Sequence, residues 1–225
     1  MNIPILYEDN HLLIVEKPVN IPVQEDNSKD ADLLTILKQD LKVRYQKPGN
    51  VFLALVHRLD RPVGGAIVFG KTSKAASRLS DMIRRHTIDR EYLTVVHGRP
   101  KQKKAKLEHY LLKDNRKNKV SVESAKHPNA KKAILEYEVI DSKEGLSLLR
   151  VKLHTGRSHQ IRVQLSTIGH PIYGDQKYGQ KHNQPGQQIA LWAHTLSFEH
   201  PVRKEPLSVK SAPPETFPWD LWRFM

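Results

Sequence analysis

Two short apolar runs separated by a polar insert constrain the fold of this chain most strongly. The runs cover residues 51–56 (VFLALV) and 66–69 (AIVF), and both are rich in β-branched or aromatic residues. Runs of this length, bounded by Gly or Pro, are typical of buried strands. The insert, residues 57–65 (HRLDRPVGG), carries a single carboxylate, Asp60, between two arginines. A polar loop on a rigid core is a common place for a functional residue, although composition alone slightly favours a solvated connection.

Further apolar runs predict many strands and few helices. Apolar residues at helical spacing predict helices at about 31–44 and 158–168, and Ser73 is expected to cap another helix that follows it. Many strands with few helices are typical of an α+β fold around a mostly antiparallel sheet. No repeat or linker divides the chain, so we expect a single domain over residues 1–225. The strands are expected as a hairpin of residues 3–7 and 12–16, and at 91–97, 107–112, 119–122, 133–140, 146–153, 187–198 and 206–210.

The chain has a strong excess of positive charge. Its 37 Lys and Arg outnumber 24 Asp and Glu, which gives a formal net charge of +13. Such an excess points to a polyanionic partner such as nucleic acid or an anionic membrane surface. No apolar run is long enough to span a bilayer and the N-terminus lacks a secretory signal pattern, so we expect a soluble cytoplasmic protein. The absence of cysteine excludes disulfides, thiolate catalysis and Cys-ligated zinc.

Several familiar catalytic patterns are missing. His154 and His159 are five residues apart without an HExxH pattern or an acidic cluster, so surface or RNA-facing histidines explain them better than a metal site. There is no GxSxG nucleophile elbow, and Gly64-Gly65 is not followed by the lysine pattern of a P-loop. The lysine-rich segment 101–106 is best explained as a solvated loop, with RNA contact as the alternative. With these patterns set aside, the sequence favours catalysis by a carboxylate, with arginines that bind an anionic substrate.

The polar insert is the first of several motifs that follow one another along the chain. It begins with HRLDR (57–61), and DREY (89–92) ahead of an apolar strand is the second motif. HTGRSHQIR (154–162) is the third, and GHPIYGD (169–175) follows it. In this order and spacing, the motifs resemble the signature of the RluA family of RNA pseudouridine synthases. The resemblance covers nearly the whole chain and implies the pseudouridine-synthase fold, with an RNA-binding cleft.

The resemblance has one local departure. The family commonly has Thr-Ser-Gly where this chain has Val63-Gly64-Gly65, so two hydroxyls near the loop are missing, while Gly64 keeps the backbone free to turn. This change concerns the positioning of the substrate rather than the nucleophile. The chain also lacks room for the N-terminal S4 RNA-binding domain of many relatives, so it resembles the forms made of the catalytic domain alone.

The resemblance implies an isomerase that converts uridine within RNA to pseudouridine without a cofactor or metal. The N-glycosidic bond breaks, the uracil turns over, and a new carbon–carbon bond forms through its C5 atom. By the motif match, Asp60 is the catalytic residue. Its carboxylate can attack the sugar C1′ or take part in removing the 2′ proton, and the sequence leaves both pathways open.

The same match implies roles for five more residues. The target base must leave its stack, and Arg58 is the candidate to fill the vacated space, with a plain phosphate contact as the alternative. Tyr92 corresponds to the active-site tyrosine that packs on the flipped base, although a core tyrosine in a strand gives the same pattern. Arg162 matches the residue that pairs with the catalytic carboxylate, and a neighbouring cation favours the ionised form. Arg157 and Gln160 are candidate phosphate or base contacts.

Two other classes of function fit part of the pattern. An RNA-binding protein that kept the fold without catalysis would need only the basic surface, so the presence of Asp60, Tyr92 and Arg162 together argues against it. A nucleic-acid hydrolase would usually need metal-binding carboxylate clusters, which the sequence lacks. We therefore expect a monomeric RNA pseudouridine synthase whose target is ribosomal or transfer RNA.

Overall fold

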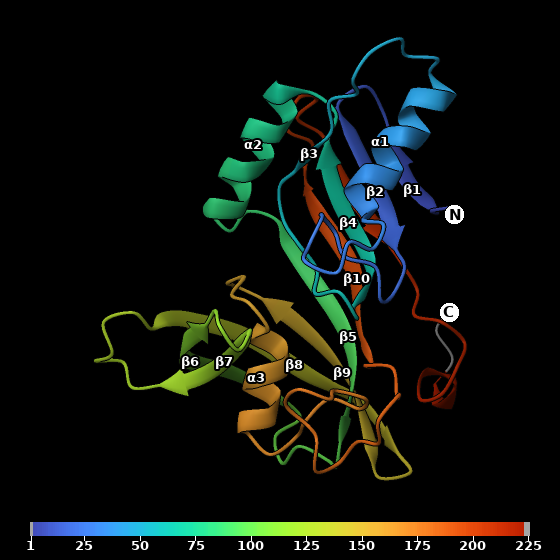
Figure 1. Ribbon diagram of the computed structural model, residues 1–225. Helices are drawn as coiled ribbons and strands as arrows, with labels where there is room; N and C mark the ends of the chain where they lie inside the picture. Colours follow the sequence, from blue (N-terminus) through green and yellow to red (C-terminus); the bar gives the residue numbers. More distant parts are fainter. Residues whose placement is uncertain (1, 223–225) are drawn as a thin grey trace. The chain divides into compact units, whose positions relative to one another are not determined.

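The computed structural model describes residues 2–222 (Figure 1) and contains two compact units. The first unit comprises the chain up to Asp89 together with Ala193–Ala212, and the second comprises Arg90–Trp192 together with the segment from Pro213. Each unit is built on antiparallel strands. The predicted fold with a mostly antiparallel sheet and few helices is therefore confirmed, whereas a single domain over residues 1–225 stays a prediction.

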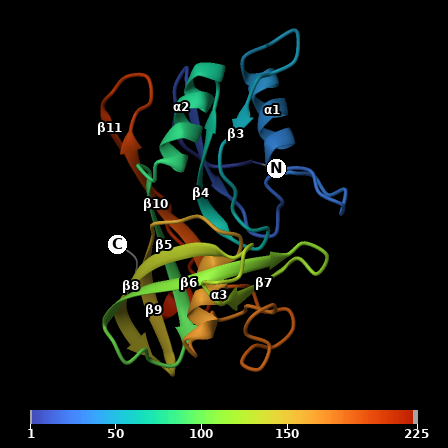
Figure 2. The same ribbon diagram turned by 90° about the vertical axis from the view of Figure 1, so that its left-hand side faces the viewer.

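The first unit is an antiparallel sheet with a helix on each face (Figure 2). Its strands are β1 (Ile5–Glu8), β2 (Leu12–Lys17), β3 (Ala54–Leu55), β4 (Gly64–Gly70), β10 (Leu191–Glu199) and β11 (Pro206–Lys210). They follow the order β1-β2-β4-β10-β11, with β3 paired to β4, and the expected hairpin of β1 and β2 is confirmed. Only two residues of the apolar run 51–56 form a strand, while Val51 and Leu53 are buried outside the ladder.

Both helices of the first unit begin after a capping side chain. α1 (Leu33–Arg44) follows Asp32, and α2 (Ser73–Arg84) follows Thr72; each cap accepts a hydrogen bond from a first-turn N–H group. The predicted cap at Ser73 is therefore wrong by one residue. Thr72 has the extended backbone that a cap requires, with φ −132° and ψ 152°, whereas Ser73 is already helical.

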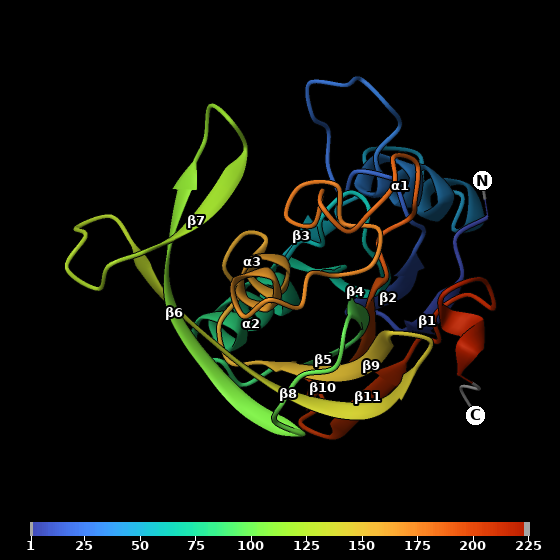
Figure 3. The same ribbon diagram turned by 90° about the horizontal axis from the view of Figure 1, so that it is seen from below.

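The sheet of the first unit is buried on both faces. Neighbouring residues of a strand point to opposite faces, and Leu12, Ile14 and Val68 pack with the apolar side of α2. Leu13 and Val15 point the other way and are also fully buried, on the side where α1 lies (Figure 3). Burial on both faces explains why β2 and β4 are continuous apolar runs in the sequence. The loop that precedes β4 therefore leads directly into a rigid core.

The second unit is a curved antiparallel sheet that wraps around one helix (Figure 3). Its elements are β5 (Asp89–His97), β6 (Lys104–Asp114), β7 (Lys119–Glu123), β8 (Lys131–Lys143), β9 (Leu146–Leu153) and α3 (Gln160–Thr167). The strand order is β5-β9-β8-β6-β7. Half of the lysine-rich segment 101–106 belongs to β6 rather than to a loop, and Lys104 pairs with Glu138 of β8 at 3.0 Å.

α3 is shorter than expected because His159, the residue before it, has a left-handed backbone with φ 51°. The last described segment of the chain packs beside the β8–β9 hairpin and includes a short 3-10 helix, η1 (Trp219–Leu221). The Trp222 indole donates a hydrogen bond to Asp141 of β8 at 3.1 Å. Within residues 2–222, no helix combines the length and the apolar character needed to cross a membrane.

Candidate active site

A buried lysine holds the loop that carries Asp60. Lys17 is the last residue of β2 and is fully buried. Its ammonium donates hydrogen bonds to the carbonyl oxygens of Pro18 (2.9 Å), Arg61 (2.9 Å) and Val63 (2.7 Å). All three donors of the ammonium are thus engaged, and two of them fix the backbone directly after Asp60.

The charge of Lys17 interacts with that of Asp60. Burial lowers the pKa of Lys17 to about 7, and the negative charge of Asp60 acts in the opposite direction and favours the ammonium form. Three carbonyl acceptors and a nearby carboxylate are the partners that a buried cation needs. In the sequence, Lys17 looks like a solvated lysine at the end of an apolar strand, which is why pattern reasoning missed it.

Two further side chains tie this loop to the first unit. The His57 ring accepts a hydrogen bond from the Val68 N–H of β4 at 3.1 Å. Arg61 forms an ion pair with Asp30 in the preceding loop. The carboxylate of Asp60 is half-buried, so it remains partly accessible on a backbone that is held at several points.

Arg58 and Asp60 lie on either side of a buried leucine in this loop. Leu59 is 7% exposed, whereas Arg58 is exposed. Alternation of buried and accessible side chains is what an extended segment produces. Both predicted site residues of the first unit are therefore accessible, and their roles stay predictions.

The glycine that this loop requires is Gly65. Its φ of 110° is rare for other residues, and a Cβ at this position would lie 2.3 Å from the carbonyl oxygen of Ala193 in β10. The backbone freedom expected at Gly64 is thus used one residue later, because β10 passes too close to β4 for any side chain there. Val63, which replaces the family's threonine, is buried and offers its carbonyl to Lys17.

Arg162 is buried in α3 and is oriented by Asp175, the last residue of the GHPIYGD motif, to which the sequence analysis gave no role. Its Nε and Nη2 donate to the two carboxylate oxygens of Asp175, each at 2.8 Å. Burial alone would raise the pKa of Asp175, but the Arg162 guanidinium and the N–H groups of Lys177 and Tyr178 outweigh burial and lower it. A bidentate pair of this kind fixes the plane of the guanidinium. The two residues are 13 positions apart, which matches no helix or strand period, so local spacing does not connect them.

Gln160 builds the turn that leads into α3. Its Oε1 accepts from the Arg157 N–H at 3.0 Å and from the Thr155 hydroxyl at 2.8 Å, and its Nε2 donates to the Ile134 carbonyl at 3.0 Å. The amide is therefore engaged within the protein, and direct contact of Gln160 with RNA stays a prediction. Arg157 is exposed, and its Nε donates to the Lys132 carbonyl at 3.0 Å.

Tyr92 is a buried residue of β5, 7% exposed, and is paired opposite Val151 of β9.

The described part of the chain, residues 2–222, contains no group of three or more His, Asp or Glu side chains arranged to hold a metal ion. The predicted site residues are divided between the units: Arg58 and Asp60 belong to the first, and Tyr92, Arg157, Gln160 and Arg162 belong to the second.

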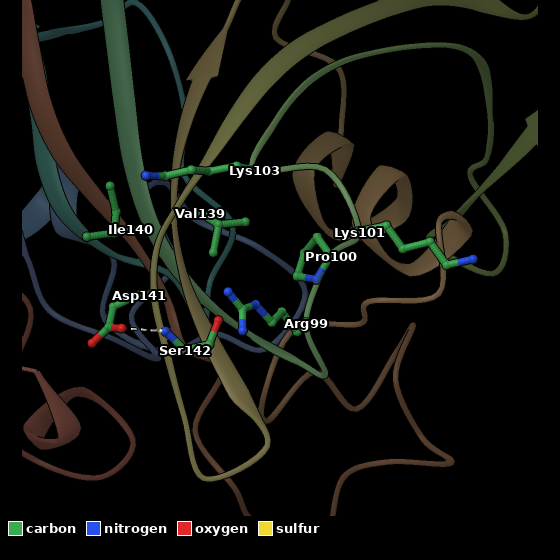
Figure 4. A pocket seen from close by; sticks show the side chains of 8 residues that line it. All are labelled: Arg99, Pro100, Lys101, Lys103, Val139, Ile140, Asp141 and Ser142. Carbon is green, nitrogen blue, oxygen red and sulfur yellow. Dashed lines mark hydrogen bonds between the residues drawn. The ribbon is translucent and has the colours of Figure 1, made fainter.

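A shallow hollow of about 300 Å³ in the second unit lies outside this set of residues (Figure 4). Arg99, Lys101 and Lys103 line it together with residues of β8. Figure 4 shows that Lys101 extends away from the other lining side chains, and Asp141 accepts a hydrogen bond from the Ser142 N–H at 2.8 Å. None of the predicted site residues lines this hollow, so it is not part of the candidate active site.

Comparison with known sequences identifies the family. The model of a family described as RNA pseudouridylate synthase matches residues 11–167, which is more than half of the chain. An uncharacterized RNA pseudouridine synthase of Bacillus subtilis is 35% identical over 223 residues, covering 96% of this chain and 69% of that protein. Ribosomal large subunit pseudouridine synthase C of Buchnera aphidicola is 30% identical over 217 residues, covering 92% of this chain and 66% of that protein. The chain thus spans about two thirds of the length of these relatives.

Solved structures agree with this assignment at the level of the fold. The human protein RNA pseudouridylate synthase domain containing 4 superposes with a TM-score of 0.82 at 22% identity, covering 97% of this chain and 91% of that one. A second human protein, RNA pseudouridylate synthase domain containing 1, superposes with a TM-score of 0.73 at 23% identity, covering 96% of this chain and 85% of that one. The chain belongs to the RNA pseudouridine synthases, isomerases that act on uridine in RNA, and the resemblance to the RluA family is confirmed.

Proposed function

We propose that this protein isomerises uridine to pseudouridine in RNA and that Asp60 is the catalytic residue. The observation that carries this proposal is the loop around Asp60, where a partly accessible carboxylate sits on backbone held by Lys17 and Arg61. Reacting groups must be held close to their productive geometry, since a small misplacement costs much of the rate. The family match supports isomerisation of uridine as the reaction, and the anchored loop supports Asp60 as the catalytic residue.

The carboxylate has two chemical routes. A uridine that has left its stack presents its sugar to Asp60. The carboxylate then either attacks C1′, which breaks the N-glycosidic bond and links the sugar to Asp60, or removes the 2′ proton as that bond breaks; both routes need the ionised form. The freed uracil turns and its C5 bonds to C1′. In the first route this displaces the Asp60 carboxylate from C1′, and in the second C2′ takes back the proton that Asp60 removed; C5 then loses its own proton to solvent. Loss of the C5 proton is common to both routes and gives a direct assay.

The other predicted residues have complementary roles in this proposal. Exposed Arg58 fills the space that the flipped base leaves, and Tyr92 packs on that base. Arg162 is the cationic partner of the catalytic carboxylate. Arg157 contacts a phosphate at the surface, and Gln160 keeps the turn before α3 in shape for substrate binding, either alone or with a contact of its own.

Ribosomal or transfer RNA is the substrate class that we propose. The Buchnera relative is named as a synthase of the large ribosomal subunit, and a net charge of +13 suits a polyanionic partner. Binding of such RNA is expected to weaken as salt rises, because phosphate contacts release counterions. We further propose that the protein acts in the cytoplasm and as a monomer.

Release of tritium from RNA labelled at uridine C5 tests this function. The change Asp60→Asn is expected to abolish release while leaving RNA affinity nearly unchanged. Asp81→Asn in α2 removes a carboxylate that pairs only with neighbouring arginines of its own helix end, so this control should release tritium like the wild type. No release from ribosomal or transfer RNA by the wild type would contradict the function. Normal release by Asp60→Asn would contradict the assignment of Asp60.

A further inference from the structure

Arg90 is a buried arginine that lacks a counter-ion in the described part of the chain. It is the second residue of β5 and is 8% exposed. Its Nε is buried without a hydrogen-bond partner, and no carboxylate of residues 2–222 forms an ion pair with the guanidinium. Buried charges are normally paired, because removing a charge from water without a partner is unfavourable. Residues 2–222 therefore provide no anion to pair with the Arg90 guanidinium.

Arg162 provides the matched contrast within the same unit. It is 6% exposed, so it is as buried as Arg90, but Asp175 satisfies it with two hydrogen bonds. The second unit thus shows that this fold can pair a buried arginine with a carboxylate of its own. Arg90 lacks such a carboxylate, which points to a partner that arrives from outside.

The guanidinium of Arg90 lies against the turn that precedes α3. β9 runs antiparallel to β5 with Lys152 opposite Glu91, so the chain after β9 passes the start of β5. A Cβ at Gly156 would lie 2.8 Å from Nη1 of Arg90. Because Gly156 is exposed, the end of the guanidinium lies just below the surface. The neighbouring Arg157 is also exposed and adds a second positive charge.

Hydrogen bonds within the protein organise this turn. The Thr155 hydroxyl donates to Gln160 and also accepts from the Ile134 N–H at 2.8 Å. Gln160 in turn accepts from the Arg157 N–H. A site that is already built loses little conformational entropy when it binds. The backbone that faces Arg90 therefore needs no rearrangement to receive an anion.

We propose that Arg90 binds a backbone phosphate of the RNA next to the target uridine, a site that rests on the proposed function. Arg90 and Tyr92 are two residues apart on β5, so they point to the same face about 7 Å apart. This spacing is similar to that between a nucleobase and the phosphate of its own nucleotide. The planar guanidinium suits a phosphate because it can donate two parallel hydrogen bonds. Every nucleotide of the substrate supplies such an anion.

Charged and neutral RNA backbones distinguish a phosphate site from other roles. The probes are a labelled oligouridylate and the same oligomer with methylphosphonate linkages, which carry no charge. The change Arg90→Gln should weaken binding of the charged probe about tenfold, as expected for a charge-assisted hydrogen bond, and leave binding of the neutral probe unchanged. The control Arg150→Gln, at an exposed arginine of β9, should leave binding of both probes close to that of the wild type. Equal binding of the charged probe by the wild type and Arg90→Gln would overturn the proposal.

Thermal stability separates a ligand contact from a structural one. If Arg90 binds an external anion, the Arg90→Met variant should have the same melting temperature as the wild type or a higher one. The reason is that the substitution removes a buried charge that has no partner in the protein. A lower melting temperature together with unchanged affinity for the charged probe would show that Arg90 is structural. Gly156→Ala keeps every charge but pushes Nη1 from its place, and it should also weaken binding of the charged probe. Tritium release by Asp60→Asn is independent of these measurements, so failure of the proposed function and failure of this site are distinguishable.

Discussion

The loop around Asp60 and the start of β5 each lie next to a buried cation, and the two regions use it in opposite ways. At the end of β2, buried Lys17 donates to three carbonyl oxygens, two of them in the loop, while exposed Arg61 pairs with Asp30. At the start of β5, Arg90 is nearly as buried as Lys17 but has no partner on Nε within residues 2–222. Satisfied cations fix a backbone, whereas an unsatisfied one is a site for an anion.

This difference matches what each region has to do. A carboxylate that attacks or deprotonates a sugar must not move, so the cations near Asp60 are engaged with the loop itself. A surface that binds RNA needs positive charge that is still available, and in our proposal Arg90 and exposed Arg157 supply it. Arg58 is the exception in the loop, because it is exposed and is proposed to reach into the RNA.

The largest effect on catalysis is expected from removing the lysine below the loop. Lys17→Met leaves two loop carbonyls and the Pro18 carbonyl without their buried donor, so the loop shifts and kcat should fall about a hundredfold. Affinity for RNA should change little, because Lys17 is fully buried. Tritium-release kinetics and direct binding measure the two quantities, with the exposed Lys74→Met as control. A folded Lys17→Met protein with normal kcat would show that the loop does not need this anchor.

The next effect is on folding and concerns the paired arginine of the second unit. Asp175→Asn leaves Arg162 buried without a full counter-ion, so the free energy of unfolding should fall by about 3 kcal/mol. Urea unfolding measures this change, and Arg90→Gln is the matched comparison because it should cause no such loss. Equal destabilisation by both changes would remove the distinction between paired and unpaired arginines.

The pH dependence of the same pair gives a smaller effect. The pKa of Asp175 lies below its ordinary value of 3.8 in the folded protein, so the pair contributes stability above pH 3.8 and loses it as pH falls through the lower, folded-state value. The difference in unfolding free energy between the wild type and Asp175→Asn should therefore be constant from neutral pH down to about pH 5 and shrink in stronger acid. A difference that stays constant in stronger acid would contradict the lowered pKa.

The smallest effect on the rate is expected from the exposed ion pair between Arg61 and Asp30. Asp30→Asn removes one of the two carboxylates that pair with Arg61, the other being Asp26; these side chains are well exposed, and exposed ion pairs contribute little. Tritium release should stay within about twofold of the wild-type rate. A loss as large as that of Lys17→Met would mean that the surface pair, rather than the buried lysine, holds the loop.

Local patterns predicted much of the fold, and they failed where tertiary contacts decide. The apolar runs of β2 and β4 and the spacing in α1 were read correctly, because burial of a face leaves a periodic signal. The predicted cap of α2 was wrong by one residue. Thr72 and Ser73 are both residue types that cap helices well, and the extended backbone of Thr72, visible only in the structure, shows which of them is the cap.

The candidate site divides in the same way. Motif order proposed Asp60 and Arg162 as site residues, and these roles stay predictions. It gave no role to the side chains that hold them, Lys17 and Asp175. Lys17 lies 44 residues before Arg61 and Asp175 lies 13 residues after Arg162, and no spacing rule links either partner to the residue it holds. The missing partner of Arg90 is visible only when its burial is known, because an arginine in a strand is otherwise expected to reach solvent.

The salt dependence of RNA affinity tests the contrast between the two regions most directly. The slope of log Kd against log salt reports how many phosphates a protein neutralises, at about 0.7 per phosphate for a single strand. Arg90→Gln should lower this slope by about 0.7 for an oligouridylate, whereas Arg61→Gln should leave it unchanged because Arg61 is already paired within the protein. An unchanged slope for Arg90→Gln, or an equal decrease for both variants, would contradict the account.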